Sequence, residues 1–289
     1  MIAITGNENV LGDGIGSIHL VDSMPQILAC SFLPEDGDEE KIHCLRPSLM
    51  ESGSSRWCTE HFPKSGGLVE VTAPGDQRIV DAARVSIAGG DVRPTSDDRK
   101  LIRYLVKNKH STPLEQVKFT FHVRLPIFVA RQWIRHRNGS FNEESARYGK
   151  LAGDFYIPSL ERLKAGGQAK DNKQGSAPAA FGDDHAQQMR ELIRMQFSSC
   201  YDQYERLLEA GLARELARIV LPTGVYTQWF WSTDLHNLMH FLRLRLHPHA
   251  QWETRRYAEA IVPMASALAP YAMEAFQESL EKGGYLVDA

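Results

Sequence analysis

Residues 118–125 carry the strongest structural signal in the chain, because apolar and polar side chains alternate along them. The apolar positions are Phe119, Phe121, Val123 and Leu125. A period of two predicts a β-strand that turns one face to the core and the other to solvent. Pro126 follows directly and suits the first position of a helix, which we expect to run to about Arg135. The chain is therefore predicted to pass from a half-buried strand straight into a helix.

More helices are predicted in the second half of the chain. Apolar residues recur at helical spacing from Gln187 to Gly211, where the glycine is a natural stop. A short helix is expected over residues 213–220, and Asp234 is suited to cap a helix over residues 235–246. A last long helix is expected to begin near Gln251.

The order of these elements indicates the fold class. Aromatic and β-branched residues over 225–232 predict a second strand. Strands and helices then follow one another without regular alternation, which argues against a doubly wound parallel sheet. We therefore predict an α+β fold, in which mixed strands and helices form a single domain.

Two stretches of the chain differ in composition from the rest. Residues 1–67 are rich in Gly, Ser, Asp and Glu and include an acidic run at 35–40, and they read as an N-terminal extension of unknown role. Residues 68–289 form the main domain. Within it, residues 164–185 carry almost no apolar pattern and are expected to be a surface insertion. We expect the N-terminal extension to be dispensable for activity.

Charge and cysteine content exclude several classes of protein. The formal net charge of −3 gives no basic field of the kind that drives non-specific binding to nucleic acid, so an anion site must be built locally. No segment is apolar for the length that crosses a bilayer, and the N-terminus shows no secretory signal. The four cysteines form no Cys-x-x-Cys pair, so we expect reduced thiols in a cytoplasmic protein.

Residues 131–148 hold the densest group of polar side chains. The charged members, apart from His136, are Arg131, Arg135, Arg137, Arg147, Glu143 and Glu144. Guanidinium groups bind phosphate through planar pairs of hydrogen bonds, so several of them together predict a site for a phosphorylated small ligand. A solvated helix end with surface ion pairs is the alternative that composition leaves open.

The order of residues in this stretch resembles the signature of flavin-dependent thymidylate synthases. The signature reads Arg-His-Arg at 135–137, then seven residues, then Ser145. Further blocks that are similar to this family lie at residues 110–113, 128–133, 214–218 and 249–253. The resemblance extends from about residue 68 to the last predicted helix.

Membership of this family implies a defined reaction. It is the methylation of dUMP to dTMP, with methylenetetrahydrofolate as the carbon donor and FAD reduced by NADPH. The resemblance also implies a cytoplasmic homotetramer whose sites are shared between subunits. The expected partners are small-molecule substrates, with neither nucleic acid nor a membrane among them.

The resemblance also assigns individual residues. Arg245 is implied as the catalytic residue, which stabilises negative charge that develops around uracil N3. The implied dUMP-binding residues are Gln132, Trp133, Ile134, Arg135, Glu143, Glu144, Ser145, Ala146, Arg147, Arg218 and Arg245. The implied FAD-binding residues are Thr112, Arg135, His136, Arg137, Glu143, Asp234, Leu235, His236 and His240, with His110 facing the flavin.

This chain departs from the family pattern at two of these positions. Asp234 stands where Asn is usual, and His236 stands where Arg is usual. An anionic side chain beside flavin phosphates is unfavourable, so a helix cap is the alternative role for Asp234.

The implied chemistry needs no cysteine nucleophile. Folate-only thymidylate synthases add a thiolate to the uracil ring, and such a thiolate needs an electropositive pocket. The motif here contains no cysteine, and Cys200 falls on the apolar stripe of its predicted helix. We expect Ser145 to donate a hydrogen bond to the dUMP phosphate rather than to act as a nucleophile.

Two other functions are compatible with parts of the pattern. A flavoprotein oxidoreductase that lacks methyl transfer would share the flavin residues. A nucleic-acid-binding module would use the arginines together with Phe141 and Tyr148, although such proteins usually show a basic stripe over a whole face.

A metal site is not expected. His236 and His240 have the spacing of a zinc-protease pair, but position 237 is Asn rather than the Glu that such an enzyme needs. Cys58 and His61 lack the tight paired spacing of a structural zinc site.

Overall fold

The structure is a computed structural model that describes residues 6–7, 9–24, 29–32, 42–44, 68–70, 74–85, 95–170, 175–178 and 181–282. The acidic run at 35–40 and the residues Cys58 and His61 lie outside this described part. Within the described ranges, no helix combines the length and the apolar character that a bilayer crossing requires.

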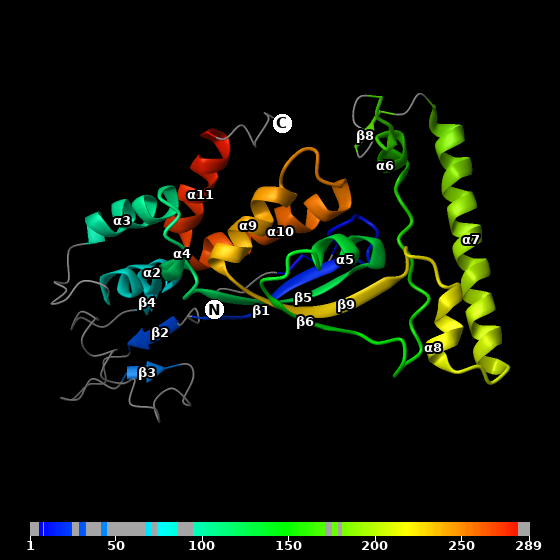
Figure 1. Cartoon of the computed structure of the whole chain (residues 1–289), viewed down its shortest axis with the longest axis horizontal. Helices are drawn as coiled ribbons and strands as arrows, with labels where there is room; N and C mark the ends of the chain where they lie inside the picture. The colour runs from blue at the N-terminus through cyan, green and yellow to red at the C-terminus, as the bar shows by residue number, and fades with distance from the viewer. Residues whose placement is uncertain are drawn as a thin grey trace.

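An antiparallel sheet of four strands forms the centre of the molecule (Figure 1). Its order is β1-β5-β9-β6, with the bounds Ser17–Met24, Lys118–Pro126, Tyr226–Asp234 and Ser140–Glu143. Phe119, Phe121, Val123 and Leu125 are fully buried, as the alternation predicts. Pro126 ends β5 instead of starting the next helix, because its extended backbone still pairs with Tyr226.

Three helices pack on one face of this sheet (Figure 1). They are α5 (Ile127–Trp133), α9 (Leu235–Arg245) and α10 (Trp252–Leu268). Aromatic rings fill the space between helices and sheet, with the Trp133 and Phe241 centroids 4.7 Å apart.

Helix α5 ends two residues earlier than predicted. The predicted helix over 235–246 is confirmed as α9, and Asp234 caps it, because its carboxylate accepts the Asn237 backbone N–H at 2.9 Å.

A second group of helices lies at the end of the molecule where α2 and α3 are drawn in Figure 1. It comprises α2 (Pro74–Val85), α3 (Thr95–Lys107), α4 (Ser111–Leu114) and α11 (Pro270–Lys282). The buried Asp76 carboxylate accepts the backbone N–H groups of Tyr271 and Ala272 at 2.7 and 3.0 Å, and burial raises the pKa of Asp76 to about 6. It thereby holds the start of α11 against α2.

The last long helix of the sequence prediction is two helices. Helix α10 ends at Leu268, and α11 begins at Pro270. A proline ring has no N–H to donate and restricts the residue before it, so Ala269 leaves the helical conformation.

The opposite end of the molecule is dominated by α7 (Asp183–Glu209), followed by α8 (Arg214–Ala217) and the 3-10 helix η2 (Arg218–Val220). Gly211, with φ of 85°, forms the turn after α7, as predicted. The predicted insertion 164–185 contains the hairpin β7–β8 (Gly167–Gln168 and Ser176–Ala177) and the first residues of α7. The helix begins before Gln187 because Asp183 and Asp184 favour a helix N-terminus electrostatically.

Residues before 67 contribute directly to the central sheet. Strand β1 pairs with β5 along its length, and Ile18 and Leu20 are buried in the main core. The hydroxyl of Tyr226 donates to the Asp13 carboxylate. The predicted boundary at residue 67 therefore does not mark the edge of the folded unit. A separate sheet with order β3-β2-β4 comprises Ile42–Cys44, Ala29–Phe32 and Leu68–Glu70.

Candidate active site

The arginines of the signature lie where α5 ends and the chain turns toward β6. Arg131, Arg135 and Arg137 are exposed, and within the described part of the chain none of them forms an ion pair. Surface guanidiniums without a carboxylate partner are free to bind an anion. This arrangement favours a phosphate site over the alternative of a helix end held by surface ion pairs.

Arg245, the last residue of α9, reaches back to the end of α5. Its Nε donates to Nε2 of His136 at 3.0 Å, and its Nη2 donates to the carbonyl oxygen of Gln132 at 3.1 Å. These two bonds fix the plane of the guanidinium. Its Nη1 has no hydrogen-bond partner among the described residues, so this edge is available to a ligand.

His136 is held in its neutral form. Burial, together with the positive charge of Arg245 and the electrostatic influence of the nearby His240, lowers the pKa of His136 to about 4, and burial also lowers the pKa of Arg245. Since a guanidinium always donates, Nε2 of His136 must accept, and the ring proton then sits on Nδ1. A neutral imidazole therefore orients a cationic guanidinium without adding a second charge.

This arrangement predicts a pH dependence of stability. The folded-state pKa of His136 lies below its unfolded value of about 6.5, so the unfolded chain binds more protons between pH 6.5 and 4. Stability conferred by neutral His136 is present above pH 6.5 and is lost as the pH falls toward 4. We expect the melting temperature of the flavin-free protein to fall less over this window in His136→Asn than in the wild type. Parallel curves for the two proteins would contradict a neutral, buried His136.

Residues assigned to the flavin come together from three segments. The rings of His136 and His240 lie 5.9 Å apart, and the Asn138 side-chain amide donates to Asn237 at 3.1 Å. The segment after α4 is tied to the start of α9, because the Leu235 backbone N–H donates to Val117 at 2.9 Å. These contacts bring the α4 region, the signature turn and the first turns of α9 to one edge of the molecule.

A cavity of about 810 Å³ opens beside α4. His110 and Thr112 line it, together with Arg78 and Lys109, which were not predicted as site residues. Lys109 has a φ of 56°, a conformation that is uncommon for a residue with a side chain. Arg78 and Lys109 in this lining, which also holds Asp81, and the exposed Arg135 and Arg137 outside it are cations that suit the phosphates of an FAD group in chemistry.

Three assigned residues have limited access to a ligand. The side chains of Trp133 and Leu235 are fully buried, so only their backbone atoms are candidates for contact. The Asp234 carboxylate is occupied at the N-terminus of α9, where Nδ2 of Asn237 also donates to it at 2.8 Å. Sequence position alone did not reveal this, because a motif on a helix contains both inward-facing and outward-facing residues.

A second cavity, of about 480 Å³, is lined by some of the other residues assigned to dUMP. Its lining includes Glu143, Glu144, Ser145, Ala146 and Arg218. The Thr227 hydroxyl donates to Glu143 at 2.8 Å, which orients that carboxylate.

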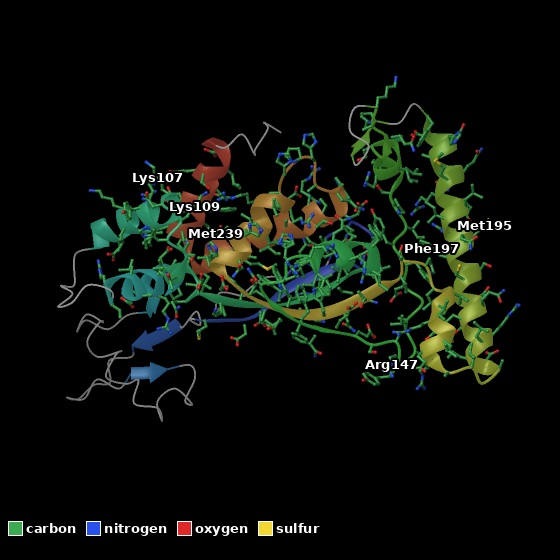
Figure 2. All side chains as sticks on the ribbon, in the orientation of Figure 1. Lys107, Lys109, Arg147, Met195, Phe197 and Met239 are labelled. Carbon is green, nitrogen blue, oxygen red and sulfur yellow. The ribbon has the colours of Figure 1, made fainter. Side chains whose placement is uncertain are left out.

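The remaining arginine of this group stands close by. Nε of Arg147 lies 3.3 Å from the Glu215 carboxylate, and Figure 2 shows Arg147 near α8, far from Lys109. Neither Gln132 nor Arg245 lines the second cavity. One chain thus presents the residues assigned to dUMP in two groups.

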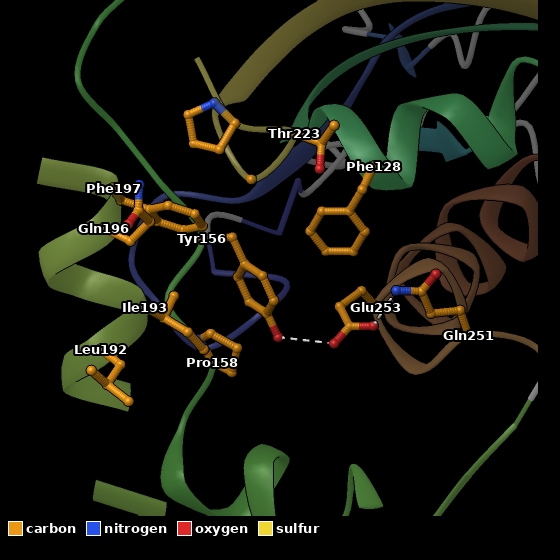
Figure 3. A pocket seen from close by; sticks show the side chains of 12 residues that line it. Phe128, Tyr156, Pro158, Leu192, Ile193, Gln196, Phe197, Thr223, Gln251 and Glu253 are labelled. Atoms are coloured by element: carbon orange, nitrogen blue, oxygen red, sulfur yellow. Dashed lines mark hydrogen bonds between the residues drawn. The ribbon is translucent and has the colours of Figure 1, made fainter. Parts of the chain in front are cut away.

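Two polar side chains connected to Gln132 belong to the family-like block 249–253 but were not predicted as site residues. Gln132 Nε2 donates to the side-chain oxygen of Gln251, and Gln251 Nε2 donates to Glu253 at 2.9 Å. Figure 3 shows Gln251 and Glu253 beside a cavity of about 530 Å³ between α7 and the core. Burial of a Glu at the start of a helix would have pointed to a structural or functional role for Glu253. The sequence alone does not reveal that Glu253 is buried.

Comparisons with known proteins agree with the resemblance. The sequence profile of the family described as "Thymidylate synthase complementing protein" matches residues 67–271. The flavin-dependent thymidylate synthase of Gluconobacter oxydans is 51% identical over 206 residues, which cover 70% of this chain and 67% of that protein. That of Thermus thermophilus is 47% identical over 211 residues, which cover 73% of this chain and 75% of that protein.

A solved structure is similar over most of its length. The UMP/dUMP methylase PolB from Streptomyces cacaoi, bound with 5-Br dUMP, is 37% identical to this chain with a TM-score of 0.65. The match covers 73% of this chain and 93% of that one. The matched profile includes the signature, the relatives and the solved structure each cover about 70% of this chain or more, and this chain belongs to the family of flavin-dependent thymidylate synthases.

Proposed function

We propose that this chain methylates dUMP to dTMP, with methylenetetrahydrofolate as the carbon donor and FAD reduced by NADPH. The observation that carries the proposal is the setting of Arg245. Its guanidinium is fixed by two hydrogen bonds to neutral His136 and to the Gln132 carbonyl, and one edge remains for a ligand. A positive group held rigidly in a partly dry site stabilises charge that develops on a bound ring.

Activation of the uracil ring is the task assigned to Arg245. Carbon 5 becomes nucleophilic when electron density is pushed toward it, and negative charge then gathers around N3. A guanidinium at that position lowers the barrier without a covalent bond to the enzyme. Cys200 lies on α7, where its sulfur accepts a hydrogen bond from the Gln196 side chain, and it takes part in neither of the two hydrogen bonds that hold Arg245.

The flavin would be held by groups from the three segments that meet near α4 and α9. Arg135 and Arg137 supply positive charge, His136 and His240 supply ring nitrogens, and Thr112 lines the larger cavity. When FAD is bound, it supplies the hydride chemistry of the reaction, which no side chain can provide.

The nucleotide phosphate would be bound by the second cavity. Arg218 provides charge in the lining and Ser145 provides a hydroxyl, while Arg147 stands beside the cavity in an ion pair with Glu215. The Ser145 oxygen accepts the backbone N–H of Arg147 at 3.3 Å, which leaves its proton free to be donated. Nucleophilic attack needs an adjacent base, and the Glu143 carboxylate in the same cavity already accepts a hydrogen bond from Thr227, which supports a binding role for Ser145.

We expect Ser145→Ala to weaken dUMP binding by about 1.5–3 kcal/mol while the variant still makes dTMP, because only a charge-assisted hydrogen bond is lost. Single-turnover dTMP formation at saturating dUMP measures the chemical step. Ser140→Ala, in the exposed strand β6, is the matched control and should bind dUMP normally. Complete loss of product in Ser145→Ala with dUMP still bound would make Ser145 the nucleophile.

We further propose that this chain assembles in the cytoplasm into a homotetramer whose active sites are shared between subunits. The two groups of dUMP residues support shared sites, since a neighbouring subunit can bring one group to the other. Large apolar side chains stand exposed on α7, on η2 and on the sheet face opposite the helices, and they include Leu192, Met195, Ile219 and Phe230. Subunit contacts would bury such surfaces.

Binding of FAD and dUMP tests the function directly. The purified protein, alone or after addition of FAD, should show flavin absorption in the visible range and should bind dUMP in titration. Protein that binds neither molecule contradicts the proposal. Protein that binds FAD and oxidises NADPH but does not bind dUMP would instead be a flavoprotein oxidoreductase without methyl transfer.

A further inference from the structure

A chain of hydrogen bonds links the buried carboxylate of Glu253 to Gln132. Glu253 is almost fully buried near the start of α10, where Nε and Nη2 of Arg162 donate to its two oxygens at 2.7 and 3.4 Å. The Tyr156 hydroxyl donates to the same carboxylate at 3.1 Å (Figure 3). The fourth donor is Nε2 of Gln251, whose side-chain oxygen accepts from Gln132.

The carboxylate sets the direction of every bond in this chain. A carboxylate that is paired with a guanidinium only accepts hydrogen bonds, so Gln251 must turn its NH₂ group toward Glu253. The oxygen of Gln251 then faces Gln132, which must in turn offer its own NH₂ group. Neither amide can be reversed without placing two acceptors or two donors against each other.

The fixed direction of these hydrogen bonds also orients the side-chain atoms of Gln132 that are left to bind a ligand. With one N–H committed to Gln251, the side chain has its oxygen and its second N–H in fixed positions. The backbone carbonyl of the same residue accepts from Arg245. Gln132 therefore stands between the buried carboxylate and the guanidinium that acts on the substrate.

We propose that Glu253 and Gln251 are positioning residues for dUMP, which fix the orientation of the Gln132 amide before the nucleotide binds. The inference rests on the proposed function, since it takes dUMP as the ligand of Gln132. Glu253 does not touch the nucleotide. It is anchored through Arg162 to α6 (Leu160–Lys164), so the segment before α7 also supports the site.

We call the hydrogen-bonded series from Glu253 through Gln251 to Gln132 the relay. Gln251→Leu tests it, because this change removes the middle side chain of the series and leaves the Glu253–Arg162 ion pair in place. Loss of a hydrogen bond that pre-orients a binding group should raise the Kd and the KM for dUMP about tenfold. The kcat should change much less, since the amide binds the ground state and the transition state alike. FAD affinity and melting temperature, measured on the same protein, report whether the fold is intact.

A matched control and a double-mutant cycle separate positioning from general stability. Gln196→Leu changes a glutamine that lines the same cavity but bonds to Cys200 instead, and it should leave dUMP affinity unchanged. If Gln251 acts through Gln132, adding Gln251→Leu to Gln132→Leu should weaken dUMP binding no further. An additive loss in the double variant, or wild-type affinity in Gln251→Leu, would overturn the relay. A wild-type protein that binds no dUMP would instead overturn the proposed function.

Discussion

Arg245→Ala is expected to lower dTMP formation by about 10²–10³-fold at saturating dUMP, while FAD remains bound. The variant removes a guanidinium whose plane is set by His136 and by the Gln132 carbonyl. Such a preorganised group needs no rearrangement as charge develops, so its loss falls on the chemical step. Single-turnover experiments that follow dTMP directly measure this step without product release.

Arg243→Ala is the matched control for this change. Arg243 also lies in the last turn of α9, but two positions along a helix point in different directions. The control should keep its turnover, so a loss shared by both variants would indicate a damaged helix. Near-normal single-turnover rates in Arg245→Ala would remove Arg245 from the catalytic role.

Removal of residues 1–24 is expected to prevent stable folding. The deletion strips β1 from β5 and takes away the buried side chains of Val10, Leu11, Ile18 and Leu20. Truncating one buried aliphatic residue typically costs ~2–5 kcal/mol, whereas a whole domain is stable by only ~5–15 kcal/mol. This expectation replaces the one drawn from sequence, in which the first 67 residues were dispensable.

Point variants in β1 measure the same contribution in a protein that still folds. Ile18→Ala should lower the free energy of unfolding by ~2–4 kcal/mol, because Ile18 has no exposed surface. Val21→Ala, in the same strand, should change it by less than ~1 kcal/mol, because Val21 is 51% exposed. Equal effects of the two substitutions in denaturant titrations would show that β1 is not part of the stable core.

Sequence reasoning succeeded where a short pattern decides the structure. Strand β5 follows from alternation over eight residues, and the start of α9 follows from a capping Asp234. Strand β1 was missed because its pairing shifts register between Leu20 and Asp22, which breaks the alternation on which the prediction depends. The division of the last helix rests on Pro270, which helical spacing of apolar residues does not reveal.

The site was predictable as a set of residues but not as an arrangement. The signature is local, so its arginines are visible in the sequence. The bond between Arg245 and His136 joins residues 109 positions apart, and no spacing rule predicts it. The relay through Gln251 and Glu253 was equally hidden from sequence reasoning, since only the fold brings α10 beside the end of α5.

Conversion of dUMP to dTMP by the purified protein tests the central claim most directly. The reaction would contain FAD, NADPH, methylenetetrahydrofolate and dUMP, and labelled carbon in the folate would be followed into the nucleotide. The account predicts labelled dTMP that disappears when the folate is omitted or when the flavin has been removed from the protein. Protein that binds FAD and dUMP and oxidises NADPH, but transfers no label to the nucleotide, would contradict it.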